Sequence, residues 1–380
     1  MDAIPGTFDK LSLLTPGFAE RAPLHDRSAS FPFENFQELS DAGLLALPVD
    51  KAYGGGGGGI RDAARVVGAV GQADAATALV LAMHYIHHLV IAAGGRWPAH
   101  LAEKVGRDAV KRLALINALR VEPDLGSPAR GGLPVTTARR TPQGWRISGR
   151  KIYSTGAPIL AWMTVWAKTD EPELRTGLFL VPANSAGITI AETWDHLGLR
   201  ASGSHDVIFD DVLIPDDHAI DLRQPKGWGP PDVTQATIQA VLVGAVYDGV
   251  ARAAQNWLIQ FLRTRTPSSL GAPLATLPRM QESVGGIEAL LSVNARLLAT
   301  FARDLDDGVA LTAVEANILK LTVTNNAIAA VEQALSLTSN HGLSRTNPLE
   351  RHYRDVLCGR VHTPQDDSTR LAAGRLALGI

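Results

Sequence analysis

Residues 197–215 read Leu-Gly-Leu-Arg-Ala-Ser-Gly-Ser-His-Asp-Val-Ile-Phe-Asp-Asp-Val-Leu-Ile-Pro. A Gly-x-Arg-x-Ser turn leads into an alternating apolar and polar run, which closes on Asp-Asp-Val-x-x-Pro. Such alternation predicts a β-strand with one buried face. Pro215 ends the run, because proline cannot donate a hydrogen bond to a neighbouring strand. The stretch therefore predicts a sheet in the middle of the chain.

Further runs with a period of two begin at about Leu115. Two of them, 136–140 and 144–149, flank a short connection that contains Pro142 and predict a hairpin. These runs and their β-branched or aromatic successors predict a mostly antiparallel β-domain. The successors lie at 163–168, 176–181, 188–190 and 207–212.

The sequence on both sides of this β-domain has helical spacing. On the C-terminal side, apolar residues recur every three to five positions, which predicts long amphipathic helices of bundle type. On the N-terminal side, six glycines at 54–59 separate two helical runs, and we expect them to form a flexible loop. The predicted helical runs are 36–44, 60–70, 75–91, 241–261, 287–305 and 314–335.

Composition excludes several classes of function. The 380 residues are 46% apolar and 19% charged, as in a soluble enzyme with two or three domains. The net charge of −2 gives no electrostatic reason to expect nucleic acid as a partner. The chain has one cysteine, Cys358, and no uninterrupted apolar stretch of about 18 residues that would predict a membrane span. We expect a cytoplasmic protein.

Short motifs on either side of residues 197–215 stand in a fixed order along the chain. Together they resemble the acyl-CoA dehydrogenase superfamily, and the resemblance extends over nearly the whole sequence. The motifs are Phe31-Pro32, Leu39-x-x-x-Gly43-Leu44, Glu122-Pro123-x-x-Gly126-Ser127, Gly149-x-Lys151 and Leu349-Glu350-Arg351-x-x-Arg354-Asp355. In the last motif, i,i+4 spacing predicts two helix salt bridges, Glu350–Arg354 and Arg351–Asp355.

The resemblance implies an α+β fold in three parts. These are an N-terminal helical domain at 1–114, a central antiparallel β-barrel-like domain at 115–226 and a C-terminal four-helix bundle at 227–380. It also implies a flavin cofactor, either FAD or FMN, and a homotetramer or homodimer.

The resemblance assigns flavin contacts to particular residues. Tyr153 would cover the flavin ring, and Thr155, next to Ser154, would donate near its N5 atom. Leu119 and Val121 would contact the pyrimidine edge through their backbone. Ser127, Arg265 and Gln365 complete the set of predicted cofactor contacts.

A dehydrogenase of this superfamily needs a carboxylate that removes a proton from its thioester substrate. The two positions that supply it in the family are occupied here by Thr363 and Gln239, which cannot accept that proton. His362 stands beside the first of them, as in the oxygenating branch, which uses O2 and reduced flavin from a separate reductase. A histidine suits proton donation to reduced oxygen, or removal of a proton from a phenol or amine substrate. Its alternative role is to hydrogen-bond Asp366 or Asp367 and close a loop.

Three functions follow, in decreasing order of preference. The first is a monooxygenase acting on a small organic substrate, with His362 and Thr155 as catalytic residues and His84, Gln239 and Thr363 in the substrate pocket. The second is an acyl-CoA dehydrogenase with a base at another position. The third is a flavin-free binding scaffold. His84, His87 and His88 have the spacing of metal ligands, but no acidic residue or cysteine lies near them in sequence, so we expect no metal.

Overall fold

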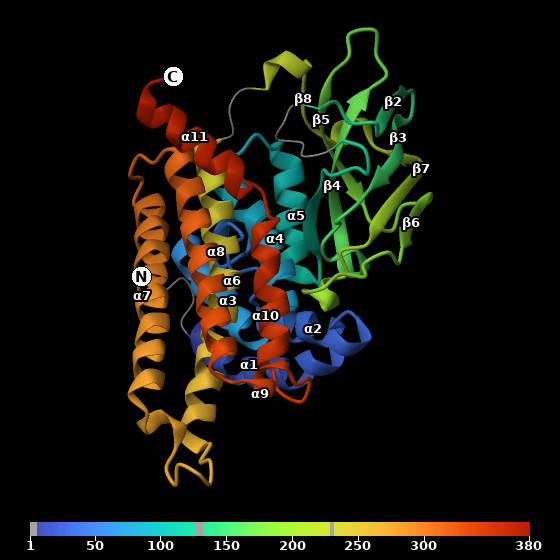
Figure 1. Ribbon diagram of the computed structural model, residues 1–380. Helices are drawn as coiled ribbons and strands as arrows, with labels where there is room; N and C mark the ends of the chain where they lie inside the picture. Colours follow the sequence, from blue (N-terminus) through green and yellow to red (C-terminus); the bar gives the residue numbers. More distant parts are fainter. Residues whose placement is uncertain (1–5, 126–131, 229–231) are drawn as a thin grey trace.

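The computed structural model describes residues 6–125, 132–228 and 232–380. It has a helical layer, a twisted sheet and a bundle of long helices, which is the predicted α+β order (Figure 1). Helices α3 and α4 lie in the interior and pack on α6 of the bundle. The N-terminal helices are α1 (Thr7–Ser28), α2 (Phe33–Asp41), α3 (Ile60–Ala73), α4 (Ala75–Ala92) and α5 (Ala99–Lys111).

The eight strands form one mostly antiparallel sheet with the order β6-β7-β3-β2-β4-β5-β8, and β1 pairs with β4 in parallel. The predicted hairpin is present, because β2 and β3 pair antiparallel across the turn that holds Pro142. The strand predicted from residues 207–212 is β7. The strands are β1 (Leu115–Leu119), β2 (Thr137–Thr141), β3 (Gly144–Lys151), β4 (Leu160–Thr169), β5 (Thr176–Pro182), β6 (Ile188–Ala191), β7 (Asp206–Ile214) and β8 (Ala219–Arg223).

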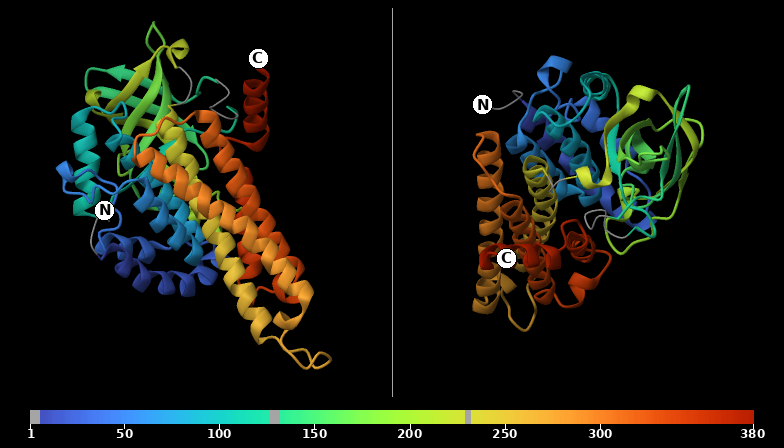
Figure 2. Two further views of the ribbon diagram at one scale, coloured as in Figure 1. Left: turned by 90° about the vertical axis from the view of Figure 1, so that its left-hand side faces the viewer. Right: turned by 90° about the horizontal axis from the view of Figure 1, so that it is seen from above.

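The C-terminal part contains three long helices that pack side by side, and α10 packs against two of them (Figure 2). Apolar side chains of α6, α7, α8 and α10 form one buried cluster, as the predicted bundle requires. The helices are α6 (Val233–Thr264), α7 (Pro278–Asp306), α8 (Ala313–Ser336), α9 (Asn340–Leu343), α10 (Leu349–Leu357) and α11 (Asp366–Leu378).

The glycine run is more ordered than we expected. The amide groups of Gly56, Gly57 and Gly58 donate hydrogen bonds to carbonyl groups of residues 46–49. A Cβ on Gly55 would lie 2.3 Å from the Val49 carbonyl oxygen, so no larger side chain fits there. The predicted loop is present, but hydrogen bonds hold its backbone where we expected flexibility, and the glycines permit this close backbone approach.

The 197–199 turn and the Arg-Asp motif meet in space. The Leu199 amide donates to Asp355 Oδ1 at 2.6 Å, and a Cβ on Gly198 would lie 2.2 Å from the Arg354 carbonyl oxygen. The Arg354 guanidinium binds Asp26 at 2.6 Å and Glu350 at 2.8 Å. Of the two predicted i,i+4 pairs, only Glu350–Arg354 forms, since Asp355 accepts from Leu199 instead. This junction joins α1, the β-domain and α10.

Two helices, α4 and α7, are long and apolar enough to cross a membrane by length and composition alone. Of the span in α4, 72% is buried inside the protein, which is what a core helix requires. The span in α7 is 17% buried. Core helices of soluble proteins pass the same test, so these two helices are weak evidence for a membrane protein.

Candidate active site

The segment that follows β3 carries the predicted ring contacts. Tyr153 has a left-handed backbone (φ 57°), and its side chain is 54% exposed. Its ring meets Trp194 and His196 edge-on, and those two stack 3.6 Å apart. A non-glycine residue with positive φ is costly, so the surrounding structure must hold Tyr153 in place. An aromatic face is thus presented to solvent beside the turn.

Thr155 lies in a chain of hydroxyl groups. Its Oγ1 is 3.0 Å from Ser204 Oγ, which is 2.7 Å from Ser202 Oγ. The Asn117 side-chain amide donates to the Thr155 carbonyl oxygen at 2.9 Å and so fixes the local backbone. Thr155 remains partly exposed, whereas the neighbouring Ser154 is fully buried. The Thr155 hydroxyl can therefore reach a ligand directly, and the Ser154 hydroxyl cannot.

Sequence reasoning missed Asn117 and Ser204. Asn117 lies among the apolar residues of β1, and a single polar residue there does not form a sequence motif. Ser204 belongs to the turn that identified the fold, but its partner Thr155 is 49 residues away. A polar residue inside an otherwise apolar strand was the one available signal for Asn117, because buried amides are normally hydrogen-bonded.

The predicted pyrimidine-edge segment lies against the same region. Leu119 is buried at the end of β1, and the Val121 carbonyl oxygen accepts from the Ile152 amide at 3.0 Å. Beside them, Lys151 forms a buried ion pair with Glu122 at 2.6 Å. Burial lowers the pKa of Lys151 to about 8, and the Glu122 pair opposes that shift. This ion pair joins two motifs that are separate in sequence, the one that contains Glu122 and the one that contains Lys151.

Gln239 and Thr363, the two positions that we expected to correspond to the base of dehydrogenases, lie next to each other. The Gln239 side-chain amide donates to the Thr363 carbonyl oxygen at 3.2 Å, which joins α6 to the loop between α10 and α11. Lys320 of α8 supports the same loop by donating to the Pro364 carbonyl oxygen at 3.1 Å. Asp366 accepts from Asn325 at 2.9 Å. Within the described ranges, no carboxylate forms a hydrogen bond with Gln239 or with Thr363.

His362 packs against α6. Its ring centroid lies 5.6 Å from that of Tyr247, at an angle of 49°. Burial lowers the pKa of His362 to about 4, and the positive charge of Lys320 lowers it further. No residue in the described part of the chain forms a hydrogen bond or an ion pair with this ring, so the alternative role as a partner of Asp366 or Asp367 is not realised. His362 is therefore a neutral imidazole at pH 7.

Two of the three histidines of α4, His84 and His87, have hydrogen-bond partners, whereas the buried Nε2 of His88 has none among the described residues. The fully buried His84 accepts from the Ile116 amide and donates to the Leu45 carbonyl oxygen, so both ring nitrogens are used. Burial lowers its pKa to about 4. The geometry thus gives His84 a structural role and no access to a substrate. The described residues contain no group of three or more His, Cys, Asp or Glu side chains placed to hold a metal ion.

The other predicted cofactor contacts are Arg265, Gln365 and Ser127. Arg265 caps the C-terminal end of α6, roughly 40 Å along the helix axis from Gln239 at 1.5 Å per residue. Gln365 precedes α11, and its carbonyl oxygen accepts from the Thr369 amide. Ser127 lies outside the described residues.

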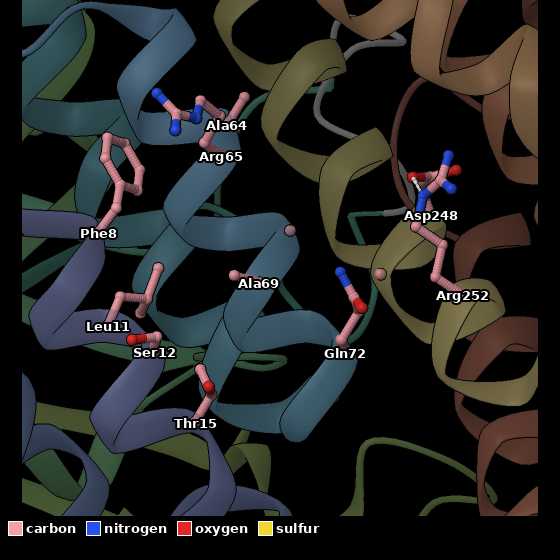
Figure 3. A pocket seen from close by; sticks show the side chains of 12 residues that line it. Phe8, Leu11, Ser12, Thr15, Ala64, Arg65, Ala69, Gln72, Asp248 and Arg252 are labelled. Carbon is pink, nitrogen blue, oxygen red and sulfur yellow. Dashed lines mark hydrogen bonds and ion pairs between the residues drawn. The ribbon is translucent and has the colours of Figure 1, made fainter. Parts of the chain in front are cut away.

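Two cavities, of about 430 and 420 Å³, open elsewhere on the protein, along α1, α3 and α6. The first is lined by Arg65 and Phe8, whose cation–π contact is 3.6 Å, and by the Asp248–Arg252 ion pair (Figure 3). None of the described residues that were predicted to bind flavin or substrate lines either cavity. We therefore assign the chemistry to the residues around Thr155 and His362, and not to these cavities.

Comparison with known proteins agrees with the order of a helical part, a β-sheet and a second helical part. The models of the acyl-CoA dehydrogenase N-terminal, middle and C-terminal domains match residues 15–96, 120–212 and 231–373. A putative acyl-CoA dehydrogenase of Bacillus subtilis, YdbM, is 33% identical over 377 residues, which cover 96% of this chain and 95% of that protein. The amino sugar nitrososynthase DnmZ of Streptomyces peucetius is 26% identical and covers 94% of this chain and 88% of its own length.

A solved structure of KijD3 in complex with FMN and a dTDP-linked amino keto sugar superposes with a TM-score of 0.83. It is 28% identical and covers 99% of this chain and 95% of its own. The fold and the similar proteins together place this chain in a class of flavin-dependent oxidoreductases in which a β-sheet lies between two helical parts. The chain belongs to the acyl-CoA dehydrogenase family, as the motifs predicted.

Proposed function

We propose that this chain is a monooxygenase that uses reduced flavin and O2 to oxidise a small organic substrate. The observation that carries the proposal is the contact between Gln239 and Thr363. Because the two dehydrogenase base positions adjoin and both are uncharged, neither can remove the α-proton of an acyl thioester. The neighbouring side chain able to accept a proton is His362. Nitrososynthases at 26–28% identity support the oxygenating branch.

The residues present suit a flavin. Tyr153 offers an aromatic face, the Thr155 hydroxyl is reachable, and the backbone of Leu119 and Val121 lies alongside. A bound reduced flavin supplies the electrons that activate O2. The chain contributes orientation through Asn117 and Ser204, which hold Thr155 in place.

His362 moves the proton in this proposal. With a pKa of about 4, its ring is neutral at pH 7, so it accepts a proton from a phenol or amine substrate more readily than it donates one. Tyr247 packs against the ring and fixes its position.

The quaternary structure and the partners are part of the same proposal. Because Arg265 lies at the opposite end of α6 from Gln239, we propose a homotetramer or homodimer in which a second copy supplies the Arg265 contact. A separate reductase delivers the reduced flavin, and the assembly works in the cytoplasm.

The second candidate is an acyl-CoA dehydrogenase with another base. Burial raises the pKa of Asp355 to about 7, which suits a general base. However, Asp355 is buried and already accepts a hydrogen bond from the Leu199 amide in the junction. A third candidate, a flavin-free scaffold, would bind neither form of the cofactor.

Flavin titration in both redox states separates the three. We expect reduced FMN or FAD to bind at least tenfold tighter than the oxidised form, and NADH with a reductase to yield products 16 mass units heavier from a panel of phenols and amines. Anaerobic bleaching of protein-bound FAD by butyryl-CoA would overturn the proposal in favour of the dehydrogenase. Failure to bind either redox state would favour the scaffold.

A further inference from the structure

Arg120 is a buried cation for which the described residues provide no counter-ion. It follows β1, and its guanidinium lies 5.0 Å from the centre of the Trp166 ring. Its Nε is inaccessible to solvent and has no hydrogen-bond partner. Burial lowers the pKa of Arg120, and no described carboxylate offsets that effect. Leaving a charge in this state is costly, since buried cations are normally paired.

The carboxylate of Glu122, two residues along the chain, is already fully used. Glu122 accepts from Lys151 Nζ at 2.6 Å, from the Val135 amide at 2.6 Å and from the Thr136 amide at 3.0 Å. Among the described residues, no carboxylate therefore forms a hydrogen bond or an ion pair with Arg120.

Arg120 lies on the side of the sheet that faces α4. Thr164 and Trp166 alternate onto this face of β4, and the Thr164 hydroxyl donates to His87 Nε2 at 3.3 Å. His87 also donates from Nδ1 to the Met83 carbonyl oxygen. Burial lowers the pKa of His87 to about 4, and the charge of Arg120 lowers it further, so this ring is neutral. Arg120 and His87 both keep partial solvent exposure, so a small molecule can reach them.

We propose that Arg120 binds a carboxylate or phosphate group of the substrate, with His87 and Trp166 as the walls of that subsite. The guanidinium group can donate two parallel hydrogen bonds to the two oxygens of such a group. The bound anion would then be the counter-ion of Arg120. The inference rests on the proposed function in assigning the anion to a substrate. Leu119 and Val121, which alternate away from Arg120, remain on the flavin side.

The test is a binding measurement on the full chain that requires no flavin, O2 or turnover. The probes are benzoate, its neutral counterpart benzamide, and inorganic phosphate as a competitor, measured by titration calorimetry. We expect the wild type to bind benzoate over benzamide by roughly tenfold to a hundredfold, the usual range for a charged hydrogen bond. Arg120→Met should abolish this preference. Arg139→Met, which removes an exposed arginine paired with Asp211, should retain it.

A thermal melt distinguishes binding from a structural role. Because Arg120→Met removes an unpaired buried charge, its melting temperature without probe should equal or exceed that of the wild type. Benzoate should raise the melting temperature of the wild type and not of the variant.

Three outcomes overturn the inference. The first is a wild type without preference for benzoate or phosphate over benzamide. The second is a lower melting temperature for Arg120→Met with the benzoate preference intact, which would make the contact with Trp166 structural. The third is a variant that loses FMN affinity but keeps the benzoate preference, which would assign the charge to the cofactor. Failure of the oxygenase assay alone leaves these binding results unaffected.

Discussion

Two stretches that meet at helix α10 differ in how their polar groups are used. In the junction, Arg354 is bound by Asp26 and Glu350, and Asp355 by the Leu199 amide. In the loop that follows, His362 has no hydrogen bond or ion pair among the described residues, and its ring packs against Tyr247. The side chains of Arg354 and Asp355 are thus paired, and the His362 ring is not. Polar side chains that all have hydrogen-bond or ion-pair partners stabilise the fold. A polar side chain without a partner in the protein can interact with a ligand.

Removing the free imidazole should have the largest effect on activity. His362→Ala is expected to lower the rate of oxygenated product formation about 10²- to 10⁴-fold, the usual contribution of a general base. Reduced FMN affinity and the denaturation midpoint should stay unchanged, because the ring has no hydrogen bond to lose. Product yield is measured by mass spectrometry, with Val361→Ala, a change at a neighbouring exposed residue, as the control. A His362→Ala variant with wild-type turnover would refute the assignment.

Breaking the ion pairs of the junction should instead lower the free energy of unfolding. Arg354→Met leaves the carboxylates of Asp26 and Glu350 without their partner, which costs about 3 kcal/mol in the free energy of unfolding. Denaturant titration measures the loss. Arg360→Met breaks an exposed pair with Glu332 and should cost less than about 1 kcal/mol. Equal losses in the two variants would contradict the contrast between junction and surface.

The Thr155 hydroxyl should have a smaller effect, on cofactor affinity. Thr155→Val keeps the shape of the side chain and removes one hydrogen bond, so flavin should bind about five- to tenfold more weakly. Quenching of flavin fluorescence gives the dissociation constant. Ser12→Ala, at an exposed position on α1, serves as the control. If Thr155→Val binds flavin as tightly as the wild type, the hydroxyl is not a contact.

The smallest effect concerns pH. The pKa of His362 is about 4 in the folded protein, below its ordinary value of 6.5, so the ring stays neutral as the pH falls from 8 to 6. The rate of the chemical step should therefore change little across that range and fall only as the pH approaches 4. The free energy of unfolding should also fall with pH. Between about pH 6.5 and 4 the histidine is protonated in the unfolded chain and neutral in the folded protein, so acid favours unfolding. A pH–rate profile with an acidic limb near 6.5 would show an exposed histidine instead.

The order of the elements was predictable because it rests on local periodicity. The hairpin at Pro142, the strand at 207–212 and the bundle helices follow from spacing alone. The glycine run was misjudged because its partners, residues 46–49, are defined by backbone contacts that leave no trace in a residue pattern. His84 was misplaced for a similar reason: whether a histidine on a helix faces substrate or core depends on the elements that cover it.

The sequence by itself determined the family, the absence of a carboxylate at Thr363 and Gln239, and the presence of His362 beside them, since these are matters of residue identity and register. Only the tertiary structure decided that Gln239 touches the Thr363 backbone, that Arg354 and Asp355 close a junction, and that the Arg120 Nε is buried without a partner among the described residues. Hydrogen bonds, burial and the pKa of a group depend on neighbours that are distant in the chain. Residue spacing shows which groups are present, and packing decides which of them remain unpaired.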